Sequence, residues 1–208
     1  MTKKAWLLAG TAAAAAAVAV GNRRIHTVEY SVWSPKLPPE FDGYKIAQIS
    51  DLHGKSFGCR NERLLDAVRR RNPDLVVLTG DITEHEPEDV PGLYRFLGQL
   101  GSEYPSVYIP GNHEQKTPRR RYARILDAME SHHIECLCDS VKVLRAGSAA
   151  VRLYGAVLPL RYYHYLYDPV SRAAYFTSGE LERRFGTLAE DSFSILLAHD
   201  PLFFPAYA

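Results

Sequence analysis

Acidic, amide and imidazole side chains recur in this sequence, each time directly after a short apolar run. About 30 residues separate Asp51 from Asp81, and Asp81 from Asn112, which is the length of one strand–helix–strand unit. Carboxylate, amide and imidazole donors together suit Mn²⁺, Fe, Zn²⁺ or a similar ion, whereas a soft metal site would need thiolates. The candidate metal-ligating or catalytic residues are Asp51, His53, Asp81, Asn112, His113 and His199.

Each of these motifs has a simpler explanation when it is taken alone. An Asp-x-His sequence is often a turn with a capping aspartate, and Gly111-Asn112 also favours a turn. Gly80-Asp81 after a strand is commoner still and carries little information by itself. All these motifs occur in one chain, and each of them follows an apolar run. Their joint occurrence therefore favours a shared site over coincidence.

The segments between these residues predict an α/β fold that begins with a parallel sheet. Apolar runs that read as strands alternate with stretches in which apolar residues recur at helical spacing. Parallel strands with crossover helices follow from that order, and their carboxyl ends share one crevice in which ligands bind. The predicted strands are 44–49, 75–78 and 107–109; the predicted helices are 62–71, 89–100 with Gly101 as a cap residue, and 119–131.

After residue 133 the pattern changes to short apolar runs joined by tight turns. This pattern predicts a second, largely antiparallel sheet whose last strand runs into His199. The predicted elements are strands at 134–137, 141–144 and 151–158, a helix at 178–185 and a strand at 193–197.

Two further segments have a pattern of their own. Residues 25–41 alternate, with Val28, Tyr30 and Val32 on one face, and predict a half-buried strand followed by a loop. Cys136 and Cys138 are interpreted as alternate positions of a strand, because three cysteines spaced this way make neither a disulfide framework nor a zinc site. The formal net charge of +1 gives no reason to expect a nucleic-acid partner.

The N-terminus carries an alanine-rich apolar run, 5–20, between Lys3-Lys4 and Arg23-Arg24. As a helix it would rise about 24 Å, short of the roughly 30 Å hydrocarbon core of a bilayer. We expect an uncleaved membrane anchor, with a cleaved signal peptide and a soluble helix as alternatives. The chain is accordingly divided into a signal-anchor or signal peptide, 1–22, and one domain, 23–208, expected on the extracytoplasmic face of the membrane.

The motifs resemble those of the calcineurin-like metallophosphoesterase superfamily, and their flanking residues look like its bacterial membrane-associated branch. The resemblance covers roughly residues 44–201 and keeps the order of the family's motifs. The matching motifs are Asp51-x-His53, Gly80-Asp81, Gly111-Asn112-His113-Glu114 and His199.

This resemblance implies a four-layer α/β/β/α sandwich with a site for two divalent metal ions (Mn, Fe, Zn or similar). Asp51 and His53 would bind one ion, Asp81 would bridge both, and Asn112 and His199 would bind the second. His113 would donate to the leaving-group oxygen, while the two cations acidify a bridging water that attacks phosphorus. The implied partners are a phosphoester substrate, with lipid-linked esters among the candidates, and the membrane that holds the N-terminal segment.

The sequence departs from the family pattern in one respect. Family members continue into a Gly-His-x-His motif that completes both metal sites, and this motif does not occur in the 208 residues. We therefore expect a sandwich that is incomplete at its C-terminus and lacks its last strands. The alternative function is a non-catalytic, truncated remnant that binds metal weakly.

Overall fold

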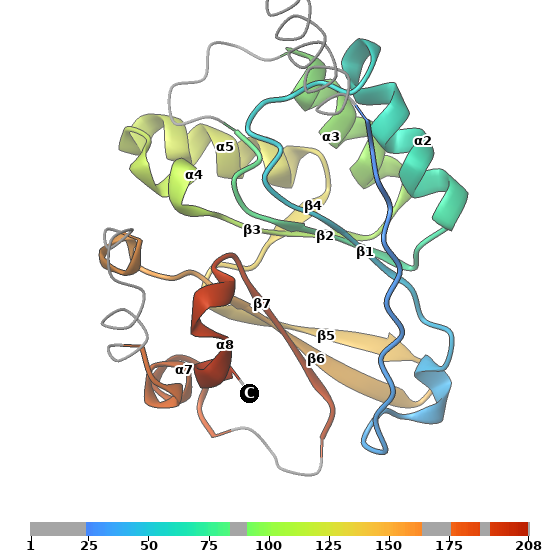
Figure 1. Cartoon of the computed structure of the whole chain (residues 1–208), viewed down its shortest axis with the longest axis vertical. Helices are drawn as coiled ribbons and strands as arrows, with labels where there is room; N and C mark the ends of the chain where they lie inside the picture. The colour runs from blue at the N-terminus through green and yellow to red at the C-terminus, as the bar shows by residue number, and fades with distance from the viewer. Residues whose placement is uncertain (1–23, 84–90, 164–175, 188–191, 208) are drawn as a thin grey trace, which may run out of the picture.

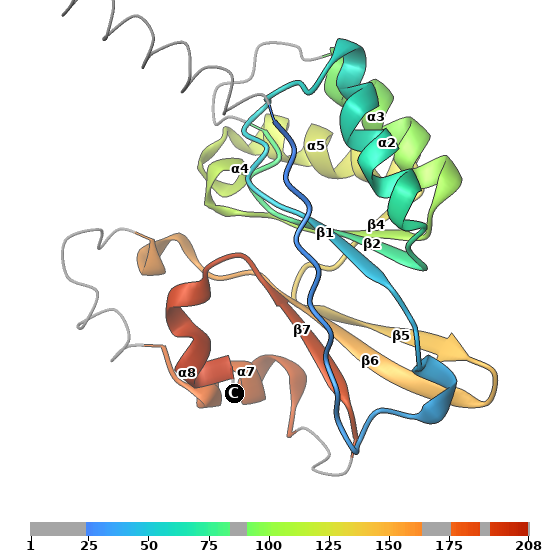
Figure 2. The same ribbon diagram turned by 45° about the vertical axis from the view of Figure 1, so that its right-hand side comes forward.

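The structure is a computed structural model, and its described elements form four layers (Figure 1). Helices cover the outer face of a first sheet, a second sheet packs against the inner face, and further helices lie beyond it (Figures 1 and 2). The predicted α/β/β/α sandwich is confirmed. The described residues are 24–83, 91–163, 176–187 and 192–207.

The first sheet consists of parallel strands in the order β1-β2-β3-β4. A crossover helix follows each of the first three strands, as the alternating pattern predicts, and α4 is a short additional helix at the end of β3. The elements are β1 (Ile46–Ile49), α2 (Glu62–Arg71), β2 (Leu75–Thr79), α3 (Pro91–Glu103), β3 (Ser106–Ile109), α4 (Asn112–Lys116), α5 (Arg119–Ser131) and β4 (Ile134–Cys136).

Strand β2 shows why the first sheet needs covering on both faces. Val76 and Leu78 join the apolar cluster under α2, α3 and α5, whereas Leu75 and Val77 join the cluster between the two sheets. All four side chains are buried because alternate residues of a strand point to opposite faces. A continuous apolar run is therefore the expected sequence of such a strand.

The second sheet has the order β5-β6-β7 and mixes both pairing directions. β5 (Ser140–Ala146) and β6 (Ala149–Ala156) are antiparallel, and β7 (Ser194–Ala198) runs parallel to β6. Its outer face packs on α7 (Ser178–Phe185) and α8 (Phe204–Tyr207) through an aromatic cluster around Phe203. Short 3-10 turns complete the fold: η1 (Pro39–Phe41), η2 (Cys59–Asn61), η3 (Leu160–Tyr162) and η4 (Pro201–Phe203).

The strand at residues 134–137 was assigned to the wrong sheet by the sequence pattern. β4 pairs in parallel with β3 and so belongs to the first sheet, after α5 as its crossover helix. A run of three strand residues does not indicate which strand it pairs with. Only the preceding helix indicated a parallel partner strand. β4 also ends at Cys136, so Cys138 is not a strand residue.

The prediction of a half-buried strand within residues 25–41 is also wrong. Residues 25–33 pair with no strand, and the side chains of Val28, Tyr30 and Val32 are exposed; the segment ends in the 3-10 turn η1. It runs from the helical side of the first sheet past the second sheet in both views (Figures 1 and 2). Alternation fits any extended backbone, and here the apolar face has no described layer against it.

The predicted cap residue Gly101 lies inside α3, which continues to Glu103. A Cβ at Gly101 would lie 1.9 Å from the carbonyl oxygen of His132, so the glycine serves close packing and not helix termination. The predicted anchor, residues 1–22, lies outside the described residues. Within the described ranges, no helix has both the length and the apolar character that crossing a bilayer requires.

Candidate metal centre

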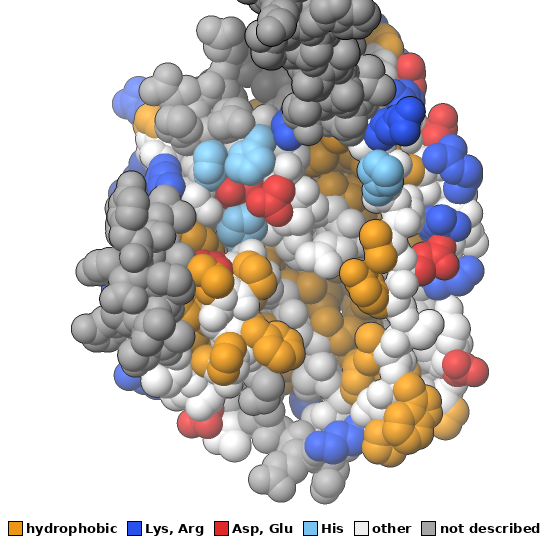
Figure 3. All heavy atoms as spheres, in the orientation of Figure 1, with side chains coloured by type: hydrophobic (Ala, Val, Ile, Leu, Met, Phe, Trp, Pro, Cys, Tyr) orange, Lys and Arg blue, Asp and Glu red, His pale blue; other side chains and the backbone are white. Residues whose placement is uncertain are grey.

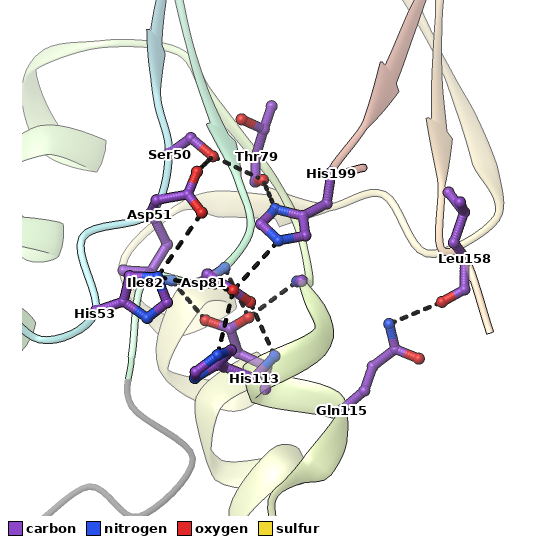
Figure 4. A network of polar contacts seen from close by, with 12 residues as sticks. Ser50, Asp51, His53, Thr79, Asp81, Ile82, His113, Gln115, Leu158 and His199 are labelled. Carbon is purple, nitrogen blue, oxygen red and sulfur yellow. Dashed lines mark hydrogen bonds and ion pairs between the residues drawn. The ribbon is translucent and has the colours of Figure 1, made fainter. Parts of the chain in front are cut away.

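The loops that follow β1 and β2 are held together by backbone hydrogen bonds. The amide of Asp51 donates to the carbonyl of Gly80 at 3.1 Å, and the amide of His53 donates to the carbonyl of Asp81 at 2.9 Å. This pairing continues the register of the two parallel strands beyond their ends. The side chains of Asp51, His53 and Asp81 consequently point toward one another (Figure 4).

These three residues share an uncommon backbone conformation. The φ angles of Asp51, His53 and Asp81 are 57°, 48° and 53°, in the left-handed region. Few residues other than glycine adopt this region, and aspartate, asparagine and histidine are enriched among those that do. Backbone strain of this kind clusters at functional sites, where the surrounding structure has to maintain it.

Two glycines let the loop after β3 approach the loop after β2. A Cβ at Gly80 would lie 2.6 Å from the Cα of Gly111, and a Cβ at Gly111 would lie 2.2 Å from Oδ1 of Asp81. No side chain fits in either place. The glycine of each motif is therefore required for the close approach of the ligand-bearing backbones.

Asp81 lies at the centre of the cluster and is almost fully buried. Its Oδ2 faces three imidazole Nε2 atoms, at 3.3 Å from His199, 3.8 Å from His113 and 3.9 Å from His53. Its Oδ1 accepts a hydrogen bond of 2.9 Å from the backbone amide of His113 (Figure 4). One carboxylate thus contacts residues from the ends of β1, β3 and β7.

The structure brings five of the six predicted residues into two groups that share Asp81. One group is His53, Asp81 and His113; the other is Asp51, Asp81 and His199. Within each group the potential ligand atoms all lie within 4.8 Å of one another. The sixth residue, Asn112, is the first residue of α4 and is half-buried beside His113.

The spacing of these atoms fits a bound cation. Nitrogen and oxygen donors bind Zn²⁺ at about 2.0–2.2 Å, so two donors of one ion are about 3–4 Å apart. His199 is also oriented as a ligand would be, because its Nδ1 lies 2.8 Å from the carbonyl oxygen of Thr79 and must donate to it. A metal-binding histidine is commonly held in this way, with the lone pair of Nε2 directed at the ion.

The side chains of the centre have the electrostatics of a carboxylate held by an imidazolium. Burial opposes ionisation of Asp81, but its hydrogen bonds with His199 and the backbone of His113 lower its pKa below the usual value. Burial likewise disfavours charge on His199, yet hydrogen bonds to Asp81 and Thr79 raise its pKa to about 9. The raised pKa means that Nε2 of His199 carries a proton at neutral pH, and a metal ion would have to displace that proton to bind there.

Glu114 is a residue of the centre that the sequence motif contained but to which no role was assigned. It is fully buried, and its carboxylate accepts hydrogen bonds from four backbone amides in two loops. These amides are those of Asp81 at 2.9 Å, Ile82 at 2.7 Å, Thr83 at 3.0 Å and Gly111 at 2.9 Å. Glu114 therefore fixes the loops after β2 and β3 relative to each other; its place in the motif gave the only signal in the sequence.

The second sheet closes the centre from the opposite side. His199 follows β7 directly, and Gln115 of α4 donates a hydrogen bond of 3.0 Å to the carbonyl of Leu158, just after β6 (Figure 4). Figure 3 shows the histidine and carboxylate side chains together on one face of the molecule. The centre is accordingly open to solvent on that face and held by both sheets.

The chain belongs to the calcineurin-like phosphoesterase family, whose model matches residues 44–204. The match begins before β1 and ends at the first residue of α8, so it includes both sheets and all six predicted site residues. The resemblance inferred from the motifs is confirmed.

Relatives of known name are similar to parts of the chain. A transmembrane protein with metallophosphoesterase domain from Danio rerio is 30% identical over 92 residues, which are 43% of this chain and 21% of the relative. An uncharacterized metallophosphoesterase from Helicobacter pylori (strain ATCC 700392 / 26695) is 25% identical over 183 residues, 87% of this chain and 44% of the relative. The matched region thus spans less than half the length of either relative.

A solved structure was also found to be similar. The crystal structure of phosphopantetheinyl hydrolase (PptH) from Mycobacterium tuberculosis matches with a TM-score of 0.46 and 21% identity. The match covers 76% of this chain and 56% of that one. At this level of similarity the match does not indicate the substrate of this chain.

Proposed function

We propose that this chain binds two divalent metal ions and hydrolyses phosphoester bonds. The observation that carries the proposal is the position of Asp81, which is shared by two groups of potential ligands. A carboxylate has two oxygens and can therefore face two cations. Membership of the calcineurin-like phosphoesterase family supports the same reaction class.

Each residue of the centre then has a distinct task. Two bound cations would shield the non-bridging oxygens of the phosphoester and supply a hydroxide at neutral pH. The family pattern assigns Asp51 and His53 to one ion, Asn112 and His199 to the other, and Asp81 to both. The interatomic distances instead group Asp51 with His199 and His53 with His113 around Asp81. Mn²⁺, Fe and Zn²⁺ are all compatible with these donors.

His113 would act on the leaving group. Its backbone amide is fixed to Oδ1 of Asp81, and its ring packs edge-on against His53 with ring centroids 4.6 Å apart. An imidazolium held in this way would donate a proton to the departing oxygen. Its membership of the group with His53 and Asp81 also makes it a potential ligand, and metal analysis of a His113 variant separates the two roles.

The test compares Asp81→Asn with Asp74→Asn, which lies at the amino end of β2 on the opposite edge of the sheet. We expect Asp81→Asn to lower turnover of bis(p-nitrophenyl) phosphate and p-nitrophenyl phosphate by at least about 10³-fold, because an amide cannot face two cations equally. Bound Mn, Fe and Zn are measured in parallel. Near-normal turnover in Asp81→Asn would refute the assignment, and a metal-loaded wild type without turnover would favour the non-catalytic alternative.

We further propose membrane association through residues 1–22, with the catalytic domain on the extracytoplasmic face and lipid-linked phosphoesters among the candidate substrates. The apolar run between two pairs of positive charges motivates this proposal, and the name of the Danio rerio relative agrees with it. Fractionation of tagged protein with and without residues 1–22 tests it. Recovery of both forms in the same soluble fraction would contradict it.

A further inference from the structure

A group of exposed cations lies next to the metal centre, at the end of α4 and on the first two turns of α5. The group consists of Lys116, Arg119, Arg120 and Arg124, and we call it the basic patch. The whole chain has a formal net charge of only +1, so this is a local concentration and not a general property of the protein.

The basic patch lacks the acidic partners that several other arginines of this protein have. Arg69 pairs with Glu103, Arg183 with Glu180 and Arg184 with Asp139. None of the four cations of the basic patch makes an ion pair or hydrogen bond with a side chain in the described ranges. Their charges are therefore available to a ligand.

The location of these arginines is electrostatically unfavourable for the protein alone. Helix α5 has no acidic residue in its first turn, and no side chain caps its start at Pro118. Because the amino end of a helix carries partial positive charge, cations are disfavoured there and anions are favoured. Arg119 and Arg120 add to that positive potential, which an anion would offset.

The basic patch begins within one helical turn of the metal centre. His113 and Lys116 are three residues apart on α4, so their side chains leave the same side of the helix and are separated by about one turn, a rise of roughly 5 Å. Nε2 of His113 is 3.8 Å from Asp81. Figure 3 shows isolated lysine or arginine side chains at the margin of the histidine group.

We propose that the basic patch binds a second phosphate group of the substrate, while the metal centre holds the phosphoester that is cleaved. The preferred substrates are then phosphoesters that carry another phosphate a few bonds away. Arginine suits this task because its planar guanidinium binds phosphate oxygens through two parallel hydrogen bonds. The substrate assignment rests on the proposed function, whereas the binding site itself can be measured without turnover.

The experiment measures binding of two probes that differ by one phosphate, propyl phosphate and propane-1,3-diyl bisphosphate. Calorimetric titration of the Mn²⁺-loaded full chain gives a dissociation constant for each. We expect the bisphosphate to bind at least about tenfold more tightly, the gain expected from one charge-assisted hydrogen bond or more. The variant R119Q/R120Q/R124Q should lose this preference and retain its affinity for propyl phosphate.

The matched control is R70Q/R145Q/R152Q, which removes the same charge from exposed positions on α2, β5 and β6. It should keep the preference for the bisphosphate, which separates the basic patch from a general effect of net charge. Both triple variants should keep the thermal midpoint of the wild type, because neither changes a buried residue, and the control should also keep its turnover of bis(p-nitrophenyl) phosphate.

Two results would overturn the inference. One is equal affinity for the two probes in the wild type, or a preference that survives in R119Q/R120Q/R124Q. The other is a variant R119Q/R120Q/R124Q that no longer binds phosphatidylglycerol vesicles but still prefers the bisphosphate. That result would assign the basic patch to binding a membrane surface. Absence of turnover in the wild type would contradict the proposed function alone, since the probe affinities do not depend on it.

Discussion

The two sheets of this protein differ in how they contribute to the candidate centre. All residues of β2 and β3 in the first sheet are buried, and five of the six predicted site residues follow its strands. In the second sheet β5 alternates in exposure, with Val141 and Val143 more than one third exposed. Among the described residues that follow its strands, only His199 reaches the centre.

Strand direction accounts for this difference. The carboxyl ends of β1, β2 and β3 lie at one edge because the strands are parallel, so three consecutive loops meet there. In the second sheet β5 runs opposite to β6, and its carboxyl end lies at the far edge. Strand β7 is parallel to β6, and it is this strand that delivers His199.

The largest expected difference between the sheets concerns their histidines. We expect His113→Gln to lower turnover by about 10²–10⁴-fold with bound metal unchanged, the usual contribution of a general acid. His199→Gln should instead lower the bound metal by about one ion per chain, because an imidazole ligand is removed. Elemental analysis and steady-state kinetics on both variants provide the measurement. Loss of metal from His113→Gln would make His113 a ligand.

A second comparison uses one glycine from each sheet. Gly111→Ala places a Cβ 2.2 Å from Oδ1 of Asp81, so we expect turnover to fall roughly hundredfold and stability by about 1–3 kcal/mol. Gly147→Ala, in the turn between β5 and β6 at φ 54°, should cost about 1 kcal/mol through backbone strain. Its turnover should match the wild type, and a wild-type value for Gly111→Ala would contradict the close approach.

The two sheets also differ in the glutamates that support them. Glu114→Gln leaves the four backbone amides with one oxygen acceptor, and we expect a loss of roughly 2–4 kcal/mol of unfolding free energy. Glu180→Gln on α7 removes the charge of a half-buried carboxylate that pairs with the exposed Arg183 and accepts a hydrogen bond from Tyr162, and it should cost under about 1 kcal/mol. Urea denaturation of both variants measures the difference, and equal costs would show that the Glu114 hydrogen bonds are not structurally important.

The smallest expected effect lies on the exposed face of the second sheet. Val143→Thr on β5 should change stability by no more than about 0.5 kcal/mol, as for other exposed positions. Val77→Thr on β2 buries a hydroxyl between the sheets and should cost about 1–3 kcal/mol. The same denaturation assay applies. Similar values at the two positions would mean that Val77 is less well packed than its burial indicates.

The sequence predicted the structure well where a residue's role depends on its local sequence. Helices α2 and α5 have the predicted bounds, and the motif residues follow the predicted strands because apolar runs and turn residues are local signals. The proximity of these residues was predicted for the same reason: Asp51 and Asp81 end neighbouring parallel strands, so topology alone brings them together.

The sequence was uninformative where the role depends on a distant partner. β4 carries the same short apolar pattern in either sheet, and the alternation of residues 25–33 did not reveal that no strand pairs with them. Gly101 looked like a helix cap because the carbonyl of His132 is remote in sequence. The hydrogen bonds of Glu114 join loops more than thirty residues apart, which no local pattern records.

The left-handed backbone at Asp51, His53 and Asp81 restricts how this site can change in evolution. A substitution at these positions has to satisfy the backbone conformation before its chemistry matters. Apart from glycine, the residue types that tolerate this conformation best are aspartate, asparagine and histidine, and all three can coordinate a metal through oxygen or nitrogen. Glutamate has the same carboxylate group as aspartate but tolerates the left-handed conformation less well. Exchange among aspartate, asparagine and histidine is therefore the accessible route by which such a centre could alter its metal preference.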